Sequence, residues 1–234
     1  MTQQRPGGEL SSRPLHFIWI TDCSGSMGND GKIQSLNNAI REAIPHMKRI
    51  ADENAEAEVL VRAIKFSDNA QWHVSQPTPV ADFKWTDLTA GGQTAMGKAL
   101  SMVADQLKIP PMTDRALPPV LVLISDGQPT DKFEEGLEQL MKLPWGIKAV
   151  RIAIAIGNDT EIETLKKFIG NDEIQPLQAN NAEALVKYIE WVSTAVLKAV
   201  SSPASQPKGS ALSAVHVPIP TAPASGLSSA LDVW

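Results

Sequence analysis

Five oxygen-bearing side chains stand in three short segments of the sequence. Asp22, Ser24 and Ser26 occupy alternate positions after an apolar run, Thr94 closes a Gly-rich segment, and Asp126 follows a second apolar run. A turn after the first run can therefore aim a carboxylate and two hydroxyls at one point. Oxygen ligands without sulfur or imidazole suit Mg²⁺ or Mn²⁺, with water or a partner's oxygen completing the coordination. Because two carboxylates also balance a dication, the pattern predicts a single divalent-cation site.

Each of these residues, taken alone, also has an ordinary structural explanation. Asp, Ser and Thr at the ends of strands commonly cap helices or form turns. The order in this chain is more specific, because Asp-x-Ser-x-Ser closes one apolar run, Gly-Gly-x-Thr opens a predicted helix and Ser-Asp-Gly closes the next apolar run. Capping alone does not account for this three-part order, so we interpret the segments as one site.

Apolar patterning predicts the elements that bring these segments together. Leu15–Thr21 and Val120–Ser125 are short apolar runs that end at polar turns, which is typical of buried central strands. Apolar residues at steps of three and four from Ile33 to Ile50 predict a helix. The other predicted strands are Ala57–Phe66, Ala70–Val74, Ala149–Ile156 and Ile174–Leu177, and the other predicted helices are Thr94–Leu107, Phe133–Lys142, Ile162–Phe168 and Ala182–Ala199.

Strands that alternate with helices predict an α/β fold with a Rossmann-like, doubly wound and mostly parallel central sheet. The short gap between Ala57–Phe66 and Ala70–Val74 predicts an antiparallel hairpin at one sheet edge. In such folds the loops at the carboxyl ends of the strands form the ligand site. The three polar segments fall in loops of this kind.

The composition indicates which binding partners and which cellular compartment are expected for this protein. Lys and Arg total 21 against 26 Asp and Glu, and the net charge of −5 with no basic run argues against a nucleic-acid partner. The single cysteine, Cys23, provides no disulfide, and its side chain should alternate away from the candidate ligands into packing. A polar N-terminus and the lack of a long apolar run predict a cytoplasmic protein without a membrane partner.

The sequence divides into a flexible N-terminus (1–13), one domain (14–200) and a tail (201–234) rich in Ser, Ala and Pro. The tail cannot build a core of its own, so we predict that it is disordered alone or docked on a partner. Bulky apolar residues return at 227–234, which favours docking onto a partner or a second copy. The alternative is an extended segment that folds back along a groove of its own domain.

These motifs resemble the von Willebrand factor type A (vWA) family and its metal-ion-dependent adhesion site, or MIDAS. Asp22, Ser24 and Ser26 match the first metal loop of the family, Thr94 matches the second and Asp126 the third, so the set is complete. The resemblance covers residues 14 to 200. It implies a non-enzymatic module whose MIDAS cation binds an Asp or Glu of a protein partner.

Within the family, the segments TDCSGSM, TAGGQTAMGKAL and LISDGQPTD are most similar to the bacterial tellurium-resistance-associated branch, called TerY-like. Members of that branch are intracellular and are associated with protein kinases and phosphatases in stress-response systems. The resemblance therefore implies a kinase or phosphatase of the same system as a partner.

Two other functions compete with this interpretation. Gly92–Lys98 is close to the P-loop of nucleotide-binding hydrolases, but Ala99 stands where Ser or Thr would ligate magnesium, and no apolar strand precedes the loop. A nucleotide-binding hydrolase that uses this loop is the alternative from the enzyme class. A structural scaffold with a vestigial metal site is the third possibility, and the complete ligand set argues against it.

Overall fold

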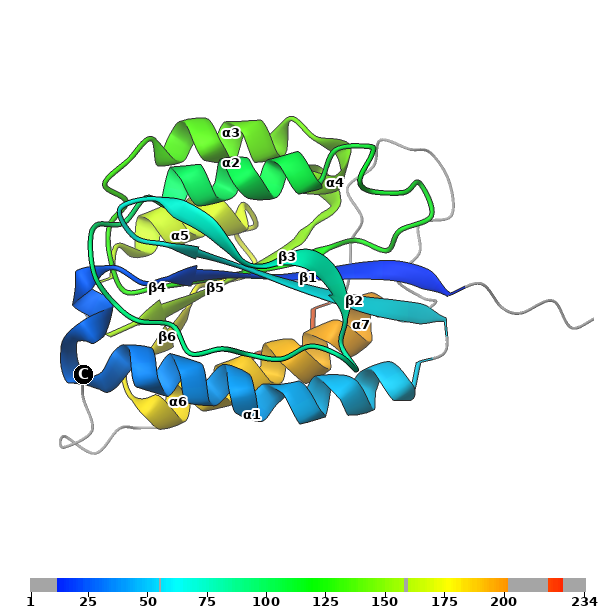
Figure 1. Cartoon of the computed structure of the whole chain (residues 1–234), viewed down its shortest axis with the longest axis horizontal. Coiled ribbons are helices and arrows are strands. Elements are labelled where there is room, and N and C mark those ends of the chain that lie inside the picture. Colours follow the sequence, from blue (N-terminus) through cyan, green and yellow to red (C-terminus); the bar gives the residue numbers. More distant parts are fainter. Residues whose placement is uncertain (1–11, 55, 158–159, 202–218, 225–234) are drawn as a thin grey trace, which may run out of the picture.

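A six-stranded sheet forms the centre of the computed structural model, which describes residues 12–54, 56–157, 160–201 and 219–224 (Figure 1). The strands follow the spatial order β3-β2-β1-β4-β5-β6, and every neighbouring pair is parallel except the antiparallel pair β2–β3. The strands are β1 (Arg13–Asp22), β2 (Ala57–Phe66), β3 (Ala70–Pro79), β4 (Val120–Ser125), β5 (Val150–Ile156) and β6 (Leu177–Ala179). The predicted α/β class, the mostly parallel sheet and the antiparallel edge hairpin are all confirmed.

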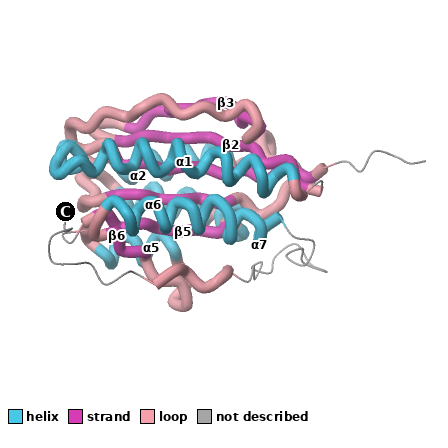
Figure 2. The backbone as a smooth tube through the Cα atoms, turned by 90° about the horizontal axis from the view of Figure 1, so that it is seen from below, coloured by secondary structure: helices cyan, strands magenta, loops and turns pink. Residues whose placement is uncertain are grey.

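Helices cover both faces of this sheet. The helices α2, α3, α4 and α5 lie on one face in Figure 1, while α1, α6 and α7 lie on the other, with α1 and α6 side by side in Figure 2. The helices are α1 (Lys32–Asp52), α2 (Met96–Gln106), α3 (Phe133–Met141), α4 (Pro144–Lys148), α5 (Ile162–Ile169), α6 (Ala182–Trp191) and α7 (Leu197–Ser201), with a 3₁₀ segment η1 (Gly25–Gly31) and a π turn η2 (Val192–Val196).

The central strand β1 separates two hydrophobic cores. Phe17 and Trp19 belong to the core beneath α1 and α6, whereas Ile18 and Ile20 belong to the core beneath α2 and α5. A strand that is covered on both faces is expected to be apolar rather than alternating, and the stretch from Phe17 to Ile20 in β1 has this form. Because β1 is buried and paired on both sides, its last residue, Asp22, is held in a fixed position.

Two of the predicted strands differ from the structure by three residues or more at one end. The strand predicted at Ala70–Val74 continues to Pro79, and as an edge strand it tolerates proline, because an N–H on its outer side has no strand to pair with. The strand predicted at Ile174–Leu177 is wrong in its position. It begins only at Leu177, because Pro176 has no N–H to donate to a neighbouring strand.

The predicted long helix Ala182–Ala199 corresponds to α6, η2 and α7, which follow one another without a gap as far as Ser201. The five-residue helix α4 has no counterpart among the predicted helices, since so short a segment shows no periodicity. In the part of the chain that the structure describes, no helix has the length and apolar character needed to cross a bilayer.

Part of the predicted tail lies against the domain. Within residues 219–224, Ile219 packs on the core beneath α6, and Lys187 of α6 donates a hydrogen bond from Nζ to the carbonyl of Ala224 at 3.0 Å. This short stretch follows the fold-back alternative. The apolar end at 227–234, on which the docking prediction rests, lies outside the described residues.

Candidate metal centre

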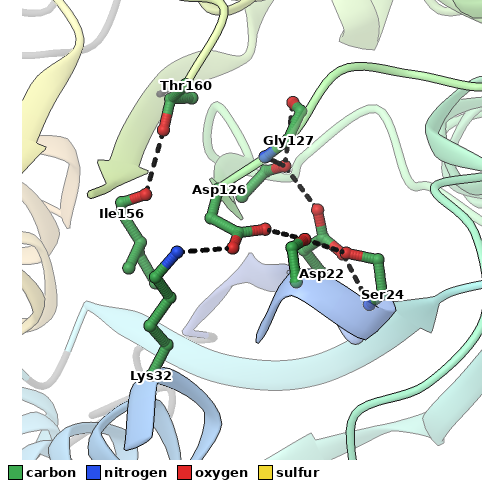
Figure 3. A network of polar contacts seen from close by, with 9 residues as sticks. Asp22, Ser24, Lys32, Asp126, Gly127, Ile156 and Thr160 are labelled. Carbon is green, nitrogen blue, oxygen red and sulfur yellow. Dashed lines mark hydrogen bonds and ion pairs between the residues drawn. The ribbon is translucent and has the colours of Figure 1, made fainter. Parts of the chain in front are cut away.

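The first and third polar segments meet at the carboxyl ends of two neighbouring strands (Figure 3). Asp22 is the last residue of β1 and Asp126 directly follows β4, and these two strands pair in parallel. The Ser24 and Ser26 hydroxyls lie 3.0 Å apart, and the Ser26 hydroxyl donates to Asp126 Oδ1 at 2.7 Å. Four of the five predicted ligands therefore lie together in one network of polar contacts.

Asp22 is a carboxylate without exposure to solvent. Its Oδ1 accepts a hydrogen bond from the Ser24 backbone N–H at 2.8 Å, and its Oδ2 accepts one from the Ser125 hydroxyl. Burial raises the pKa of Asp22 to about 6, and the neighbouring charge of Asp126 adds to the rise, although the hydrogen bonds from Ser125 and Ser24 act in the opposite direction. A buried carboxylate of this kind gains stability from a cation placed beside it.

The fifth predicted ligand, Thr94, lies on the same site. A Cβ atom built on Gly127, the residue after Asp126, would stand 3.7 Å from Thr94 Oγ1 and 3.9 Å from Ser26 Oγ. The two hydroxyls therefore flank the start of the loop that follows β4. Thr94 is buried. The structure brings all five predicted residues to one place.

Thr94 does not open a helix as the sequence predicts. Helix α2 begins two residues later, at Met96, because Thr94 pairs with the loop after β4 instead. Its N–H donates to the Thr130 hydroxyl at 3.0 Å, and its carbonyl accepts from the Thr130 N–H at 2.9 Å. Asp131 then caps α2, accepting from the N–H groups of Gly97 and Lys98 at 2.8 Å each.

Hydrogen bonds also fix the long irregular loop that carries Thr94. The Gly25 N–H donates to the Gly92 carbonyl at 2.9 Å, which joins this loop to the first predicted metal segment, Asp22–Ser26. Asn37, a buried polar residue of α1, accepts from the Leu88 N–H at 2.8 Å and from the Trp85 indole N–H at 3.0 Å, and donates to the Leu88 carbonyl at 2.9 Å. One side chain thus ties the loop to α1.

Lys32 is a charged neighbour of the site that the sequence analysis did not identify. Its Nζ lies 2.9 Å from Asp126 Oδ2, and the side chains of Lys32 and Asp126 are only 13% and 0% exposed (Figure 3). The two residues are far apart in the sequence, and a lysine at the start of a helix resembles an ordinary solvated residue. The pair became recognisable only from the fold.

The donor set fits a hard divalent cation. The described residues contain no group of three or more His, Cys, Asp and Glu side chains able to hold a metal, so a site of thiolates and imidazoles is not formed there. Asp22 and Asp126 offer carboxylate oxygens, and Ser24, Ser26 and Thr94 add hydroxyl oxygens close by. Oxygen donors of this kind are those that Mg²⁺ and Mn²⁺ prefer, usually with some water retained.

Cys23 stands between Asp22 and Ser24 but belongs to the hydrophobic core. Its side chain is buried with the residues beneath α1, which confirms the prediction that it alternates away from the oxygens into packing. Burial, together with the charge of Asp22, raises the pKa of the Cys23 thiol to about 12. The thiol is therefore protonated at neutral pH and is a poor metal ligand.

The geometry of Gly92–Lys98 does not match a P-loop. The residues directly before Gly92 form neither a strand nor a helix, whereas a P-loop follows a strand. The N–H groups at the start of α2, which would cradle a phosphate, are instead bound by the Asp131 carboxylate. This negative charge occupies the position in which a nucleotide phosphate would have to lie.

The fold and the three loops define a class of protein. The von Willebrand factor type A domain family matches residues 18–188, which is most of the chain, and the protein therefore belongs to this family. Domains of this family are protein-interaction modules, many of them with a divalent metal at the MIDAS. A comparison with curated protein sequences found no match.

Solved structures with the same fold come from distant relatives. A von Willebrand factor type A protein from Catenulispora acidiphila has a TM-score of 0.62 at 16% identity, over 80% of this chain and 43% of that chain. The pilus adhesin SpaC from Lactobacillus rhamnosus GG has a TM-score of 0.65 at 12% identity, over 81% of this chain and 31% of that chain.

A third structure is described with a metal in the MIDAS. Proximal thread matrix protein 1 from the mussel byssus, with a zinc-occupied MIDAS motif, has a TM-score of 0.60 at 19% identity, over 81% of this chain and 47% of that chain. The present chain thus spans less than half the length of each of these three proteins. At such identities the likeness shows the fold alone.

Proposed function

We propose that this chain is a non-enzymatic interaction module that holds one Mg²⁺ or Mn²⁺ ion through Asp22, Ser24, Ser26, Thr94 and Asp126. In the same proposal, the open position of the cation takes an Asp or Glu carboxylate of a protein partner. One observation carries it: two buried carboxylates lie at neighbouring strand ends, joined through the serine hydroxyls into a compact set of oxygen donors.

The cation would neutralise the two acidic residues and leave room for an added ligand. The backbone of the first metal segment holds Asp22 and Ser24 in place, while the hydroxyl hydrogens of Ser24 and Ser26 are free to rotate away from an incoming cation. A carboxylate is a strong ligand for such an ion, because it adds charge attraction to a direct oxygen–metal bond. Neutral ligands lack the first of these contributions.

Calorimetric titration of the chelator-treated chain with Mg²⁺, Mn²⁺ and Zn²⁺ tests the metal site. Asp22→Asn keeps the shape of the side chain and removes its charge, so binding should weaken by more than about tenfold. In EDTA the same variant should unfold at a higher temperature than the wild type, since it loses a buried charge whose pKa is raised. This second measurement shows that the variant is folded.

The matched control is Asp105→Asn, at the far end of α2, where the carboxylate pairs with Lys108 on the surface. It changes the net charge by the same amount and should bind the cation as the wild type does. If neither Mg²⁺ nor Mn²⁺ binds the wild type, or if Asp22→Asn binds them equally well, the metal site is misassigned.

Carboxylate binding can be tested with a simple probe. Mn²⁺ is paramagnetic, so acetate that ligates Mn²⁺ on the protein should relax faster in ¹³C NMR than acetate with free Mn²⁺ at the same concentration. Acetamide is the uncharged control and should show a much smaller effect. If acetate behaves as acetamide does in the presence of the loaded protein, the cation lacks a carboxylate-binding position.

The proposal extends to the cellular setting through the sequence motifs alone. The segment Gln128-Pro129-Thr130-Asp131 and its neighbours resemble the TerY-like, tellurium-resistance-associated branch, which supports a cytoplasmic stress-response role beside a protein kinase or phosphatase. Capture of such a partner from native cytosol should be lost in EDTA and in the Ser24→Ala/Ser26→Ala double variant. Capture that persists in both would locate the interface elsewhere.

A further inference from the structure

Lys32 occupies a position that is unfavourable for a lysine. It is the first residue of α1, and the positive end of the helix dipole favours an acidic residue there. The first turn of α1 has no acidic residue, and the residue before it, Gly31, adopts a left-handed conformation (φ 73°) without a side-chain cap. The helix itself therefore provides no reason for a cation at this position.

The ion pair with Asp126, on the neighbouring loop, accounts for the lysine at this position. Lys32 Nζ is 2.9 Å from Asp126 Oδ2, while Oδ1 of the same carboxylate accepts from the Ser26 hydroxyl. The contact is almost fully shielded from water, so the ammonium charge is weakly screened. A cation bound to Asp126 in the metal site has to share this carboxylate with Lys32, and the two positive charges repel one another.

The charges of the site then determine what it binds. Asp22, Asp126 and Lys32 together carry one negative charge, which a dication converts to one positive charge. One carboxylate from outside restores neutrality. Without Lys32 the two Asp residues and the dication are already neutral, and an added carboxylate leaves the site negative.

We propose that Lys32 lowers the affinity of the site for its cation and makes retention of the cation depend on a carboxylate ligand. This inference rests on the proposed metal-binding function. By linkage, the factor by which a carboxylate strengthens cation binding equals the factor by which the cation strengthens carboxylate binding. Lys32 is thus a determinant of the coupling between the two ligands.

The test is calorimetric titration with Mn²⁺ of the wild type, Lys32→Met, Lys32→Arg and Lys98→Met. Lys32→Met should bind Mn²⁺ about tenfold more tightly than the wild type, because a nearby positive charge has been removed. Lys32→Arg keeps the charge and should stay close to the wild type. Lys98→Met is the matched control, since Lys98 is exposed and makes no ion pair among the described residues.

A second titration, in acetate and in chloride at equal ionic strength, measures the coupling. Acetate should strengthen Mn²⁺ binding to the wild type by a larger factor than binding to Lys32→Met. Equal or weaker Mn²⁺ binding by Lys32→Met, or an equal effect of acetate on both proteins, would overturn the role of Lys32. Failure of the metal site itself gives a different result, because then none of the four proteins binds Mn²⁺.

Folding of Lys32→Met is checked by its thermal melt. In EDTA the variant should melt below the wild type, since Asp126 loses its buried counter-charge, and Mn²⁺ should raise its midpoint by more than it raises that of the wild type. If Lys32→Met does not fold without cation, Lys32→Gln replaces it, because the amide can still donate to Asp126. A variant that melts as the wild type does in EDTA and in Mn²⁺ contradicts the proposal.

Discussion

His16 makes the stability of the fold depend on pH. It lies in β1, is only 7% exposed, and its Nδ1 has no hydrogen-bond partner in the part of the chain that the structure describes. Burial, and to a lesser extent the positive charge of Arg62 on the neighbouring strand β2, lower the pKa of His16 from 6.5 to about 4. Arg62 itself donates to Gln106 of α2 at 2.8 Å.

The direction of the effect follows from proton binding. Above pH 6.5 His16 is neutral in both the folded and the unfolded chain and has no effect on the pH dependence. Between pH 6.5 and 4 the unfolded chain takes up a proton that the folded chain does not, so the free energy of unfolding falls as the pH falls. A shift from 6.5 to about 4 corresponds to a loss of about 3 kcal/mol at the low end.

Urea unfolding at several pH values between 7 and 4, in EDTA, measures this loss. His16→Leu removes the titration and should lose about 3 kcal/mol less than the wild type over the same range. The effect of His16 is the difference between the two proteins in this loss of unfolding free energy. Asp22, with its raised pKa, makes the free energy of unfolding rise as the pH falls through the same range, and this contribution is the same in both proteins. Parallel pH curves, or an NMR titration of His16 near pH 6.5, would refute the reasoning.

Three further changes test the loops and the tail. Gly92→Ala should destabilise the fold by about 1–2 kcal/mol in a urea melt, because φ is 82° and the new Cβ would lie 2.7 Å from the Asp68 carboxylate. Asp131→Ala should lower the free energy of unfolding by about 1 kcal/mol, because α2 loses its cap. The same variant should also bind Mn²⁺ more weakly than Asp105→Asn does. Ile219→Asp should lower the melting temperature if the fold-back contact contributes to stability, and an unchanged midpoint would show that it does not.

The sequence is sufficient to predict the sheet and the meeting of the three polar segments, because both follow local rules. A strand buried on both faces is an unbroken apolar run, so β1 and β4 could be located, and the polar residues directly after them had to lie at the same sheet edge. The same reasoning assigns Asp22 and Asp126 to one site although they lie 104 residues apart in the sequence. The position of the site can therefore be predicted mainly from the polar residues that directly follow the buried strands.

The residues that sequence reasoning missed act through contacts between distant segments. Lys32 is an ordinary surface residue in the sequence, and Asp131 has a part there only in the motif of the resemblance. The fold places Lys32 beside Asp126 and Asp131 at the start of α2. Thr94 was assigned to a helix for the same reason, since its pairing with Thr130 has no local signature. Asn37 alone had a signal, because it is a polar residue on the buried face of the predicted helix.

These missed residues determine how much of the site is in place before a cation binds. Asp22 is fixed by β1, whereas the loop that carries Thr94 lacks regular structure and depends on the side chain of Asn37 and on the pairing with Thr130. Ordering a loop costs about 1–2 kcal/mol per residue, and a loop that is already ordered does not add this cost to ligand binding. Under the proposed function, the affinity of the site for its cation thus depends on residues other than the five proposed ligands. A substitution of Asn37 that removes its hydrogen bonds to the loop is therefore expected to weaken cation binding, although all five proposed ligands are still present.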